Sequence, residues 1–158
     1  MRQRATSSLS LITSVPLFYL VVFVSAVPVS DASSASSDSA RRSYERGVTL
    51  FREGNADGAI EALKKAVAQN PKLAEAYHVL GLVYFQSKRN PDEAIQAYKQ
   101  SLKLGPASAE ILNDLADVYL AQGRGSDAEG VLRQALDIAP GNEEAHLDLA
   151  RLYEARHD

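Results

Sequence analysis

Few side chains in this sequence are suited to catalytic or metal-binding chemistry. The chain has 158 residues, no cysteine and three histidines, which are His78, His146 and His157. No two histidines are four residues apart, the spacing that places two imidazoles on one helix face to bind zinc. Without cysteine there is no thiolate metal site, cysteine nucleophile or disulfide. We therefore expect no metal site, and we assign His78 to a hydrogen bond within the surface described below.

Carboxylates and phosphate-binding loops give no stronger indication of catalysis. Asp114 and Asp117 are close in sequence, but we expect them on an exposed helix surface, without the apolar enclosure that raises a carboxyl pKa for acid catalysis. Gly123, Arg124 and Gly125 resemble part of a phosphate loop, but no strand pattern precedes them, so we expect an inter-helix turn. The formal net charge of −3 argues against nucleic acid as the main partner. The sequence thus predicts no enzyme and no cofactor.

A repeat of 34 to 35 residues organises the chain from about residue 40 onward. One series of small residues is Gly47, Gly81, Ala116 and Ala150. A second series is Ala59, Ala94 and Ala128, and each unit ends at Pro71, Pro106 or Pro140. Within a unit the apolar residues follow two helical stripes separated by a turn, which predicts a helix pair. Because such a pair buries its apolar face only against its neighbours, the sequence predicts a stacked all-α repeat fold.

Individual residues in these units predict how the helices pack and end. We expect Gly81 and Ala94 to be small because two helices cross closely at these positions. Gly54 and Gly123 follow the first helices of units one and three, as glycines at helix C-termini do. The second unit is one residue longer, and we place the extra residue in a loop between helices, within residues 86–90.

The spacing of these residues resembles the tetratricopeptide repeat (TPR). In unit two the resemblance rests on Ala76, Tyr77, Leu80, Gly81, Tyr84, Ala94, Tyr98, Ser101 and Pro106. It covers about residues 40–158 and implies antiparallel helix pairs in a right-handed superhelix, an α-solenoid. We expect a TPR domain with repeats at about 40–73, 74–108 and 109–142 and a closing helix over 143–157.

In TPR proteins the first helices line the concave side, so the resemblance implies a binding surface there. A helical wheel places on this face Tyr44, Val48, Phe51, His78, Leu82, Phe85, Asn113, Asp117 and Leu120, which we call the predicted groove residues. An apolar strip with polar rims is typical of a groove for a peptide or helix of a partner. Alternatively, Phe51, Phe85 and Leu120 pack between neighbouring first helices. Asn113 and Asp117 are spaced to hydrogen-bond the backbone of a ligand.

Some TPR proteins clamp a terminal carboxylate with lysine, arginine and asparagine on this face. The matching positions here are Tyr44, Val48, Val79, Glu110 and Asp114. The clamp is therefore absent, and a chaperone-tail ligand is disfavoured. The face is basic at its start and acidic later, which suits either an oppositely polarised ligand or ordinary solvation.

The N-terminal segment has the pattern of a secretory signal peptide. A basic start, an apolar centre at residues 17–24 and small residues after it follow one another. We expect residues 1–26 to be removed, with Ala26 or Ala32 as the last residue before the cut. The alternative is an uncleaved membrane anchor over residues 9–29.

A serine-rich segment at residues 27–39 follows, and we expect it to be a flexible linker. Together these features predict an exported scaffold, periplasmic or secreted, that binds a protein or peptide partner and meets a membrane only through an uncleaved leader. One alternative is a self-associating structural protein whose closing helix contacts a second copy through Leu147, Leu149, Leu152 and Tyr153. Another is a membrane-anchored assembly factor, if the leader is retained.

Overall fold

The computed structural model describes residues 29–157, in which all regular structure is helical. The predicted signal peptide at residues 1–26 lies outside the described residues, as does almost all of the alternative anchor at residues 9–29. Among the helices that are described, none combines the length and the apolar character needed to cross a bilayer.

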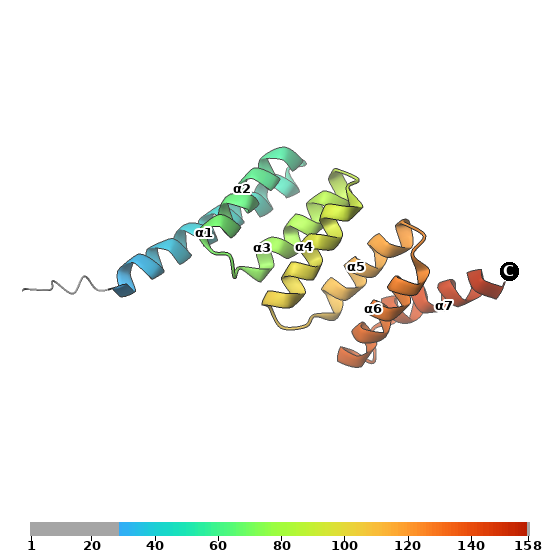
Figure 1. The fold of residues 1–158 in the computed structure, drawn as a ribbon. Helices are drawn as coiled ribbons and strands as arrows, with labels where there is room; N and C mark the ends of the chain where they lie inside the picture. Colours follow the sequence, from blue (N-terminus) through green and yellow to red (C-terminus); the bar gives the residue numbers. More distant parts are fainter. Residues whose placement is uncertain (1–28, 158) are drawn as a thin grey trace, which may run out of the picture.

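The described helices form consecutive pairs that stack side by side (Figure 1). In chain order they are α1 (Val29–Arg52), α2 (Ala56–Gln69), α3 (Ala74–Leu82), the π-helical turn η1 (Val83–Ser87), α4 (Pro91–Leu104), α5 (Ala109–Ala121), α6 (Gly125–Ile138) and α7 (Glu143–His157). Helix α1 packs on α2, α3 on α4 and α5 on α6, and α7 packs against α6. The predicted all-α fold of antiparallel helix pairs is confirmed.

Within a pair, the helices touch where a glycine of the first helix faces a large side chain of the second. A Cβ atom added at Gly81 would lie 2.5 Å from Cε1 of Tyr98, and one added at Gly47 would lie 2.6 Å from Cγ of Leu63. Tyr98 and Leu63 are fully buried. The predicted close crossing is therefore confirmed, although the ring of Tyr98, and not Ala94, occupies the space beside Gly81.

Each turn between the two helices of a pair contains a residue with a left-handed backbone conformation. In two of the three turns this residue is the glycine that the sequence predicted. Gly54 and Gly123 have φ of 80° and 71°, values that glycine adopts without the Cβ clash of other residues. The backbone N–H groups of Asn55 and Arg124 each donate to a carbonyl five residues earlier, which closes the end of the first helix. The corresponding left-handed residue in the second pair is Arg89, with φ of 52°.

The extra residue of the second unit lies inside a helix end, so its predicted place in an inter-helix loop is wrong. The turn η1 is π-helical, and Lys88 N–H donates to the carbonyl of Val83. Asn90 N–H then donates to the carbonyl of Tyr84, six residues earlier. A π turn accommodates one additional residue while keeping its backbone hydrogen-bonded, which an extended loop would not.

The serine-rich segment also differs from expectation, because α1 begins at Val29 and includes the described residues of the predicted linker. Ser36 Oγ donates to the Gln69 carbonyl at 3.0 Å, and Gln69 Nε2 donates to Ser39 Oγ at 2.8 Å. These bonds attach the start of α1 to the end of α2. Serine has an intermediate helix propensity, so contacts of this kind decide whether such a segment is helical.

Helix α7 is attached to the stack by the residues that were expected to join two copies. Leu149 and Leu152 are buried in the core cluster that also contains α4, α5 and α6. Of the four residues proposed for self-association, only Leu147 and Tyr153 are exposed. The contact proposed between closing helices is therefore much smaller than the sequence suggested.

Two glycines on helices allow a matched test of this packing. A Cβ atom added at Gly130, on α6, would have no neighbour within 4 Å, whereas one added at Gly81 would meet Tyr98. We predict that Gly130→Ala raises the free energy of unfolding by about 1 kcal/mol, because alanine loses less backbone entropy in a helix. Gly81→Ala should lower it by about 1–3 kcal/mol through overpacking. Urea denaturation measures both, and equal effects would contradict the close crossing.

Candidate functional site

The predicted groove residues lie on the first helices of the pairs, and their exposure is limited. Tyr44, Val48 and Phe51 are on α1, His78 and Leu82 on α3, Phe85 in η1, and Asn113, Asp117 and Leu120 on α5. Asn113 is buried and the other eight are partly buried. The apolar members Tyr44, Phe51, Leu82, Phe85 and Leu120 pack against the two core clusters. Part of each of these side chains is therefore used in packing, as the alternative interpretation stated. A role in binding remains a prediction.

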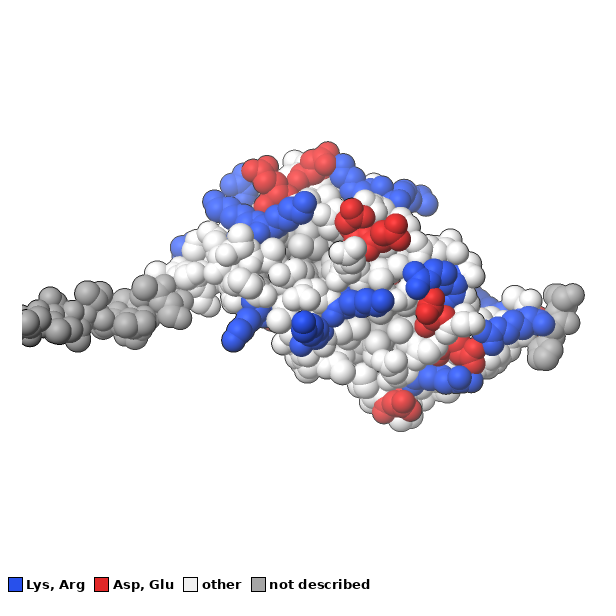
Figure 2. Space-filling view, in the orientation of Figure 1, with Lys and Arg blue, Asp and Glu red and all other residues white. Residues whose placement is uncertain are grey.

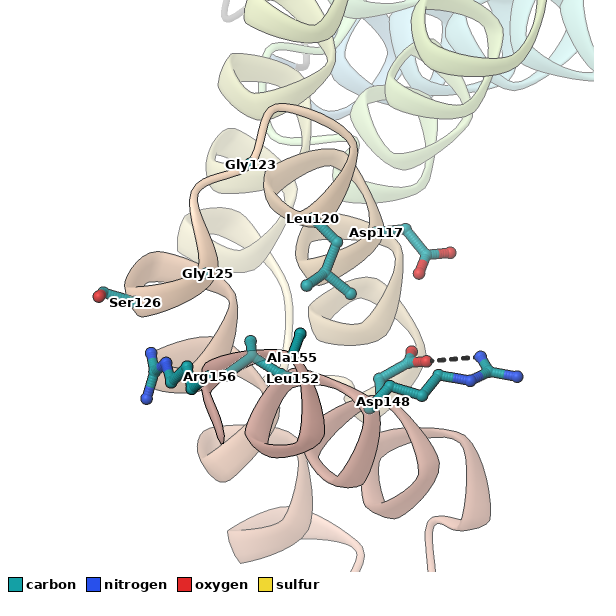
Figure 3. Close-up of a pocket in the computed structure, with 10 residues that line it drawn as sticks. Asp117, Leu120, Gly123, Gly125, Ser126, Asp148, Leu152, Ala155 and Arg156 are labelled. Carbon is teal, nitrogen blue, oxygen red and sulfur yellow. Dashed lines mark hydrogen bonds and ion pairs between the residues drawn. The ribbon is translucent and has the colours of Figure 1, made fainter. Parts of the chain in front are cut away.

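Two surface hollows occur at matching positions of successive units. The first, of about 460 Å³, is lined by Phe85, Gln86, Arg89, Pro91, Ala121 and Gln122. The second, of about 610 Å³, lies between α5, α6 and α7 and contains Leu120 and Ala155, which follow Phe85 and Ala121 by one repeat (Figure 3). The first helices therefore present hollows at the repeat spacing, each with an apolar side chain from the groove.

His78 makes the hydrogen bond that the sequence predicted for it. Its Nε2 lies 2.7 Å from Oδ2 of Asp114, which joins α3 to α5. The imidazole also lies beside the Tyr98 ring, with a centroid separation of 5.9 Å. The imidazole of His78 is thus already hydrogen-bonded within the surface formed by α3 and α5.

Asn113 is more buried than expected for an amide that hydrogen-bonds a ligand at the surface. The residue is 5% exposed, and its Nδ2 donates to Glu144 Oε2 at 2.8 Å and to Asn142 Oδ1 at 3.2 Å. Its Oδ1 has no hydrogen-bond partner among the described residues. The hydroxyl of Tyr98, which is fully buried, likewise lacks one. Buried polar atoms are almost always paired, so two unpaired ones near one surface are notable.

Acidic side chains gather around Asn113, and their surroundings differ from the exposed surface predicted for Asp114 and Asp117. Burial first, and then the neighbouring carboxylates of Asp148, Glu144 and Asp114, together raise the pKa of Asp117 to about 6. The expectation that this region lacks the enclosure needed to shift a carboxyl pKa is therefore wrong. A helical wheel gives a residue's angle on its own helix, but it does not show that α7 brings two more carboxylates alongside.

Among these residues Asp148 was missed in the sequence, although a signal for it existed. It follows Asp114 by 34 residues and thus occupies the same position one repeat later. The residue is 8% exposed, and its carboxylate accepts a hydrogen bond from Arg151 Nη1 at 3.1 Å. Elsewhere the charges are mixed, and on the face seen in Figure 2 basic and acidic side chains are interspersed.

A polar network fixes α7 where it forms one wall of the larger hollow. Glu129 of α6 accepts hydrogen bonds from Arg156 Nη1 at 2.6 Å and from the Tyr153 hydroxyl at 3.0 Å. These bonds, that of Arg156 first, lower the pKa of Glu129. Arg133 forms an ion pair with the same carboxylate. In residues 29–157 no group of three or more histidine, aspartate or glutamate side chains is arranged to hold a metal ion.

Stacked helix pairs with a hollowed face on their first helices define the TPR class of proteins. The family model described as the cilia and flagella-associated protein 70 C-terminal domain matches residues 24–158, and the chain belongs to this family. The TPR repeat-containing thioredoxin TDX of Oryza sativa subsp. japonica is 36% identical over 62 residues. That match spans 39% of this chain and 20% of the relative's length.

Solved structures share the fold. The crystal structure of MamA superposes with a TM-score of 0.72 at 26% sequence identity, covering 81% of this chain and 74% of MamA. The first TPR of Spaghetti (RPAP3), bound to the HSP90 peptide SRMEEVD, has a TM-score of 0.72 at 20% identity. That match covers 77% of this chain and 96% of the other. At 20% identity this match shows that the two chains share the fold.

The raised pKa of Asp117 predicts a stability effect with a defined sign. The folded state favours the protonated carboxyl, so the contribution of Asp117 to stability is lost as the pH rises from about 4 through about 6. We expect Asp117→Asn to raise the free energy of unfolding at pH 7 by roughly 1 kcal/mol, since solvent screening reduces the effect at a half-buried site. The gain should vanish at pH 4.

Urea denaturation at the two pH values measures this difference. Asp137→Asn on α6 serves as the control, because Asp137 is exposed and makes no contact with the acidic cluster. An equal gain at both pH values, or a loss at pH 7, would show that Asp117 is not under electrostatic repulsion in the folded protein.

Proposed function

We propose that this protein is a non-catalytic protein-interaction module that binds a peptide or a helix of a partner along its first helices. The observation that carries the proposal is the recurrence of hollows at matching positions of successive units, one at Phe85 and one at Leu120. Successive anchor side chains of an extended or helical ligand would fit such a series, since grooves of this kind are occupied by regularly spaced anchors.

A peptide bound to the TPR of Spaghetti supports the general mode of action. The ligand of this chain should nevertheless differ from the acidic HSP90 peptide of that complex. The positions at which a carboxylate clamp would stand hold Tyr44, Val48, Val79, Glu110 and Asp114. Two of these are acidic and none is basic, so an acidic peptide end would be repelled.

The proposed place of action follows from the leader sequence. We propose that residues 1–26 direct export and are then removed, which leaves a domain of three repeats and a closing helix in the periplasm or outside the cell, as a scaffold of the cell envelope. If residues 9–29 are retained, the same domain would be anchored at the membrane as an assembly factor. The charge pattern of the first 30 residues supports both versions.

Peptide binding along the first helices can be tested with two matched surface variants. Leu147 on α7 is 51% exposed and follows Asn113 by one repeat, whereas Ile138 on α6 is 45% exposed and lies on a second helix. Peptides would be selected on the full chain from a random 12-residue display library. We expect Leu147→Asp to weaken the selected peptides at least fivefold and Ile138→Asp to leave their affinity unchanged.

Fluorescence polarisation gives both affinities. A library without binders would overturn the proposed function. Equal losses in the two variants would indicate contact outside the groove.

Export is tested by N-terminal sequencing of the protein recovered from outside the inner membrane of the cells that produce it. We expect the first residue to follow Ala26 or Ala32. A protein recovered only from the membrane fraction with Met1 intact would instead support the anchor, and recovery from the cytoplasm would contradict both versions.

A further inference from the structure

The hollow between α5 and α7 has two chemically different parts. Leu120 points from α5 towards Leu152 and Ala155 of α7, and these three side chains form an apolar floor (Figure 3). Asp117 and Asp148 stand together at one end of this floor. A hollow with an apolar floor and a carboxylate end matches an amphipathic side chain that has an aliphatic stem and a cationic tip.

The two arginines that line the hollow each donate a hydrogen bond to a carboxylate of this chain, whereas the carboxylate of Asp117 has no such partner among the described residues. Arg151 donates to Asp148, and Arg156 donates to Glu129. Asp117 has neither a hydrogen bond nor an ion pair among the described residues. Burial, and after it the acidic neighbours in the cluster, raise the pKa of Asp117. The local balance of free charge is therefore negative.

The matching hollow in the preceding unit lacks this charge. One repeat before Asp117 the chain has Leu82, and the residue one repeat before Asp148, which is Asp114, is already bonded to His78. No acidic residue lines that hollow. The negative charge thus marks one position along the groove, and it could fix the register of a bound peptide.

We infer that the hollow between α5 and α7 takes a lysine or arginine side chain of the partner peptide. Its aliphatic stem lies on Leu120, Leu152 and Ala155, and its charged group lies beside Asp117 and Asp148. The inference rests on the proposed function, because it names the chemistry of the ligand at one point of that groove. Charge complementarity of this kind contributes to specificity as well as to affinity.

The test compares two small probes that differ only in the charged tip. Isotope-labelled full chain would be titrated with Nα-acetyl-lysine methylamide and with Nα-acetyl-norleucine methylamide, while the backbone amide signals of Asp117, Leu120 and Leu152 are followed by NMR. We expect the lysine probe to bind at least threefold more tightly. Asp117→Asn and Asp148→Asn should each abolish that preference, and Asp137→Asn should preserve it. The amide spectrum of each variant confirms that it is folded.

Equal binding of the two probes, no shift of these signals with either probe, or a lysine preference that persists in both variants would overturn the inference. Its failure is distinguishable from that of the proposed function. If library peptides bind in a Leu147-dependent way but are acidic or uncharged, the groove stands and the cationic position does not. If no peptide binds at all, the proposed function itself fails.

Discussion

The close contact between the two helices of a pair is the constraint on which the rest of the structure depends. At Gly81 the first helix comes so near the second that the ring of Tyr98 fills the space where a side chain would be. This contact buries the tyrosine completely, and its hydroxyl then ends near the carboxylates of Asp114 and Asp117. Burial first, and these carboxylates after it, raise the pKa of Tyr98. Tyr98 therefore takes part both in the packing of the helix pair and in the electrostatics around Asp114 and Asp117.

The same repeat produces hollows at matching positions that differ in chemistry. Their positions follow from the backbone, because each first helix leaves a space beside the next one near its C-terminal end. Their chemistry follows from single residues, since Asp117 lines the second hollow and the residue one repeat before it is Leu82, which lies outside the first hollow. A repeat fold can in this way vary its ligand one unit at a time without altering the stack that carries the residues.

The sequence predicted the elements of this fold well, because local residue patterns determine them. The small residues at 34- to 35-residue spacing predicted the pairs, and Gly54 and Gly123 predicted two of the turns. The extra residue of unit two was misplaced because a count of residues does not distinguish a longer loop from a π turn such as η1. The helical start of α1 was missed because serine content suggests flexibility, whereas its bonds to Gln69 exist only in the folded stack.

The site was harder to predict, because it depends on how neighbouring helices approach. The wheel placed Asp117 among the predicted groove residues but could not show that Asp148 and Glu144 of α7 would lie near it. It also could not show that the apolar groove residues would share their surface with the core. Only the distance between α5 and α7 turns separate acidic residues into a cluster, and no local sequence pattern determines that distance.

A crystal structure of the protein with a peptide selected on the full chain tests the central claim most directly. The account predicts that the peptide lies across α3, α5 and α7, with a lysine or arginine side chain on Leu120 and its charged group beside Asp117. A peptide bound on the outer surface of α2, α4 and α6 would contradict the account, as would one that places a carboxylate in that hollow.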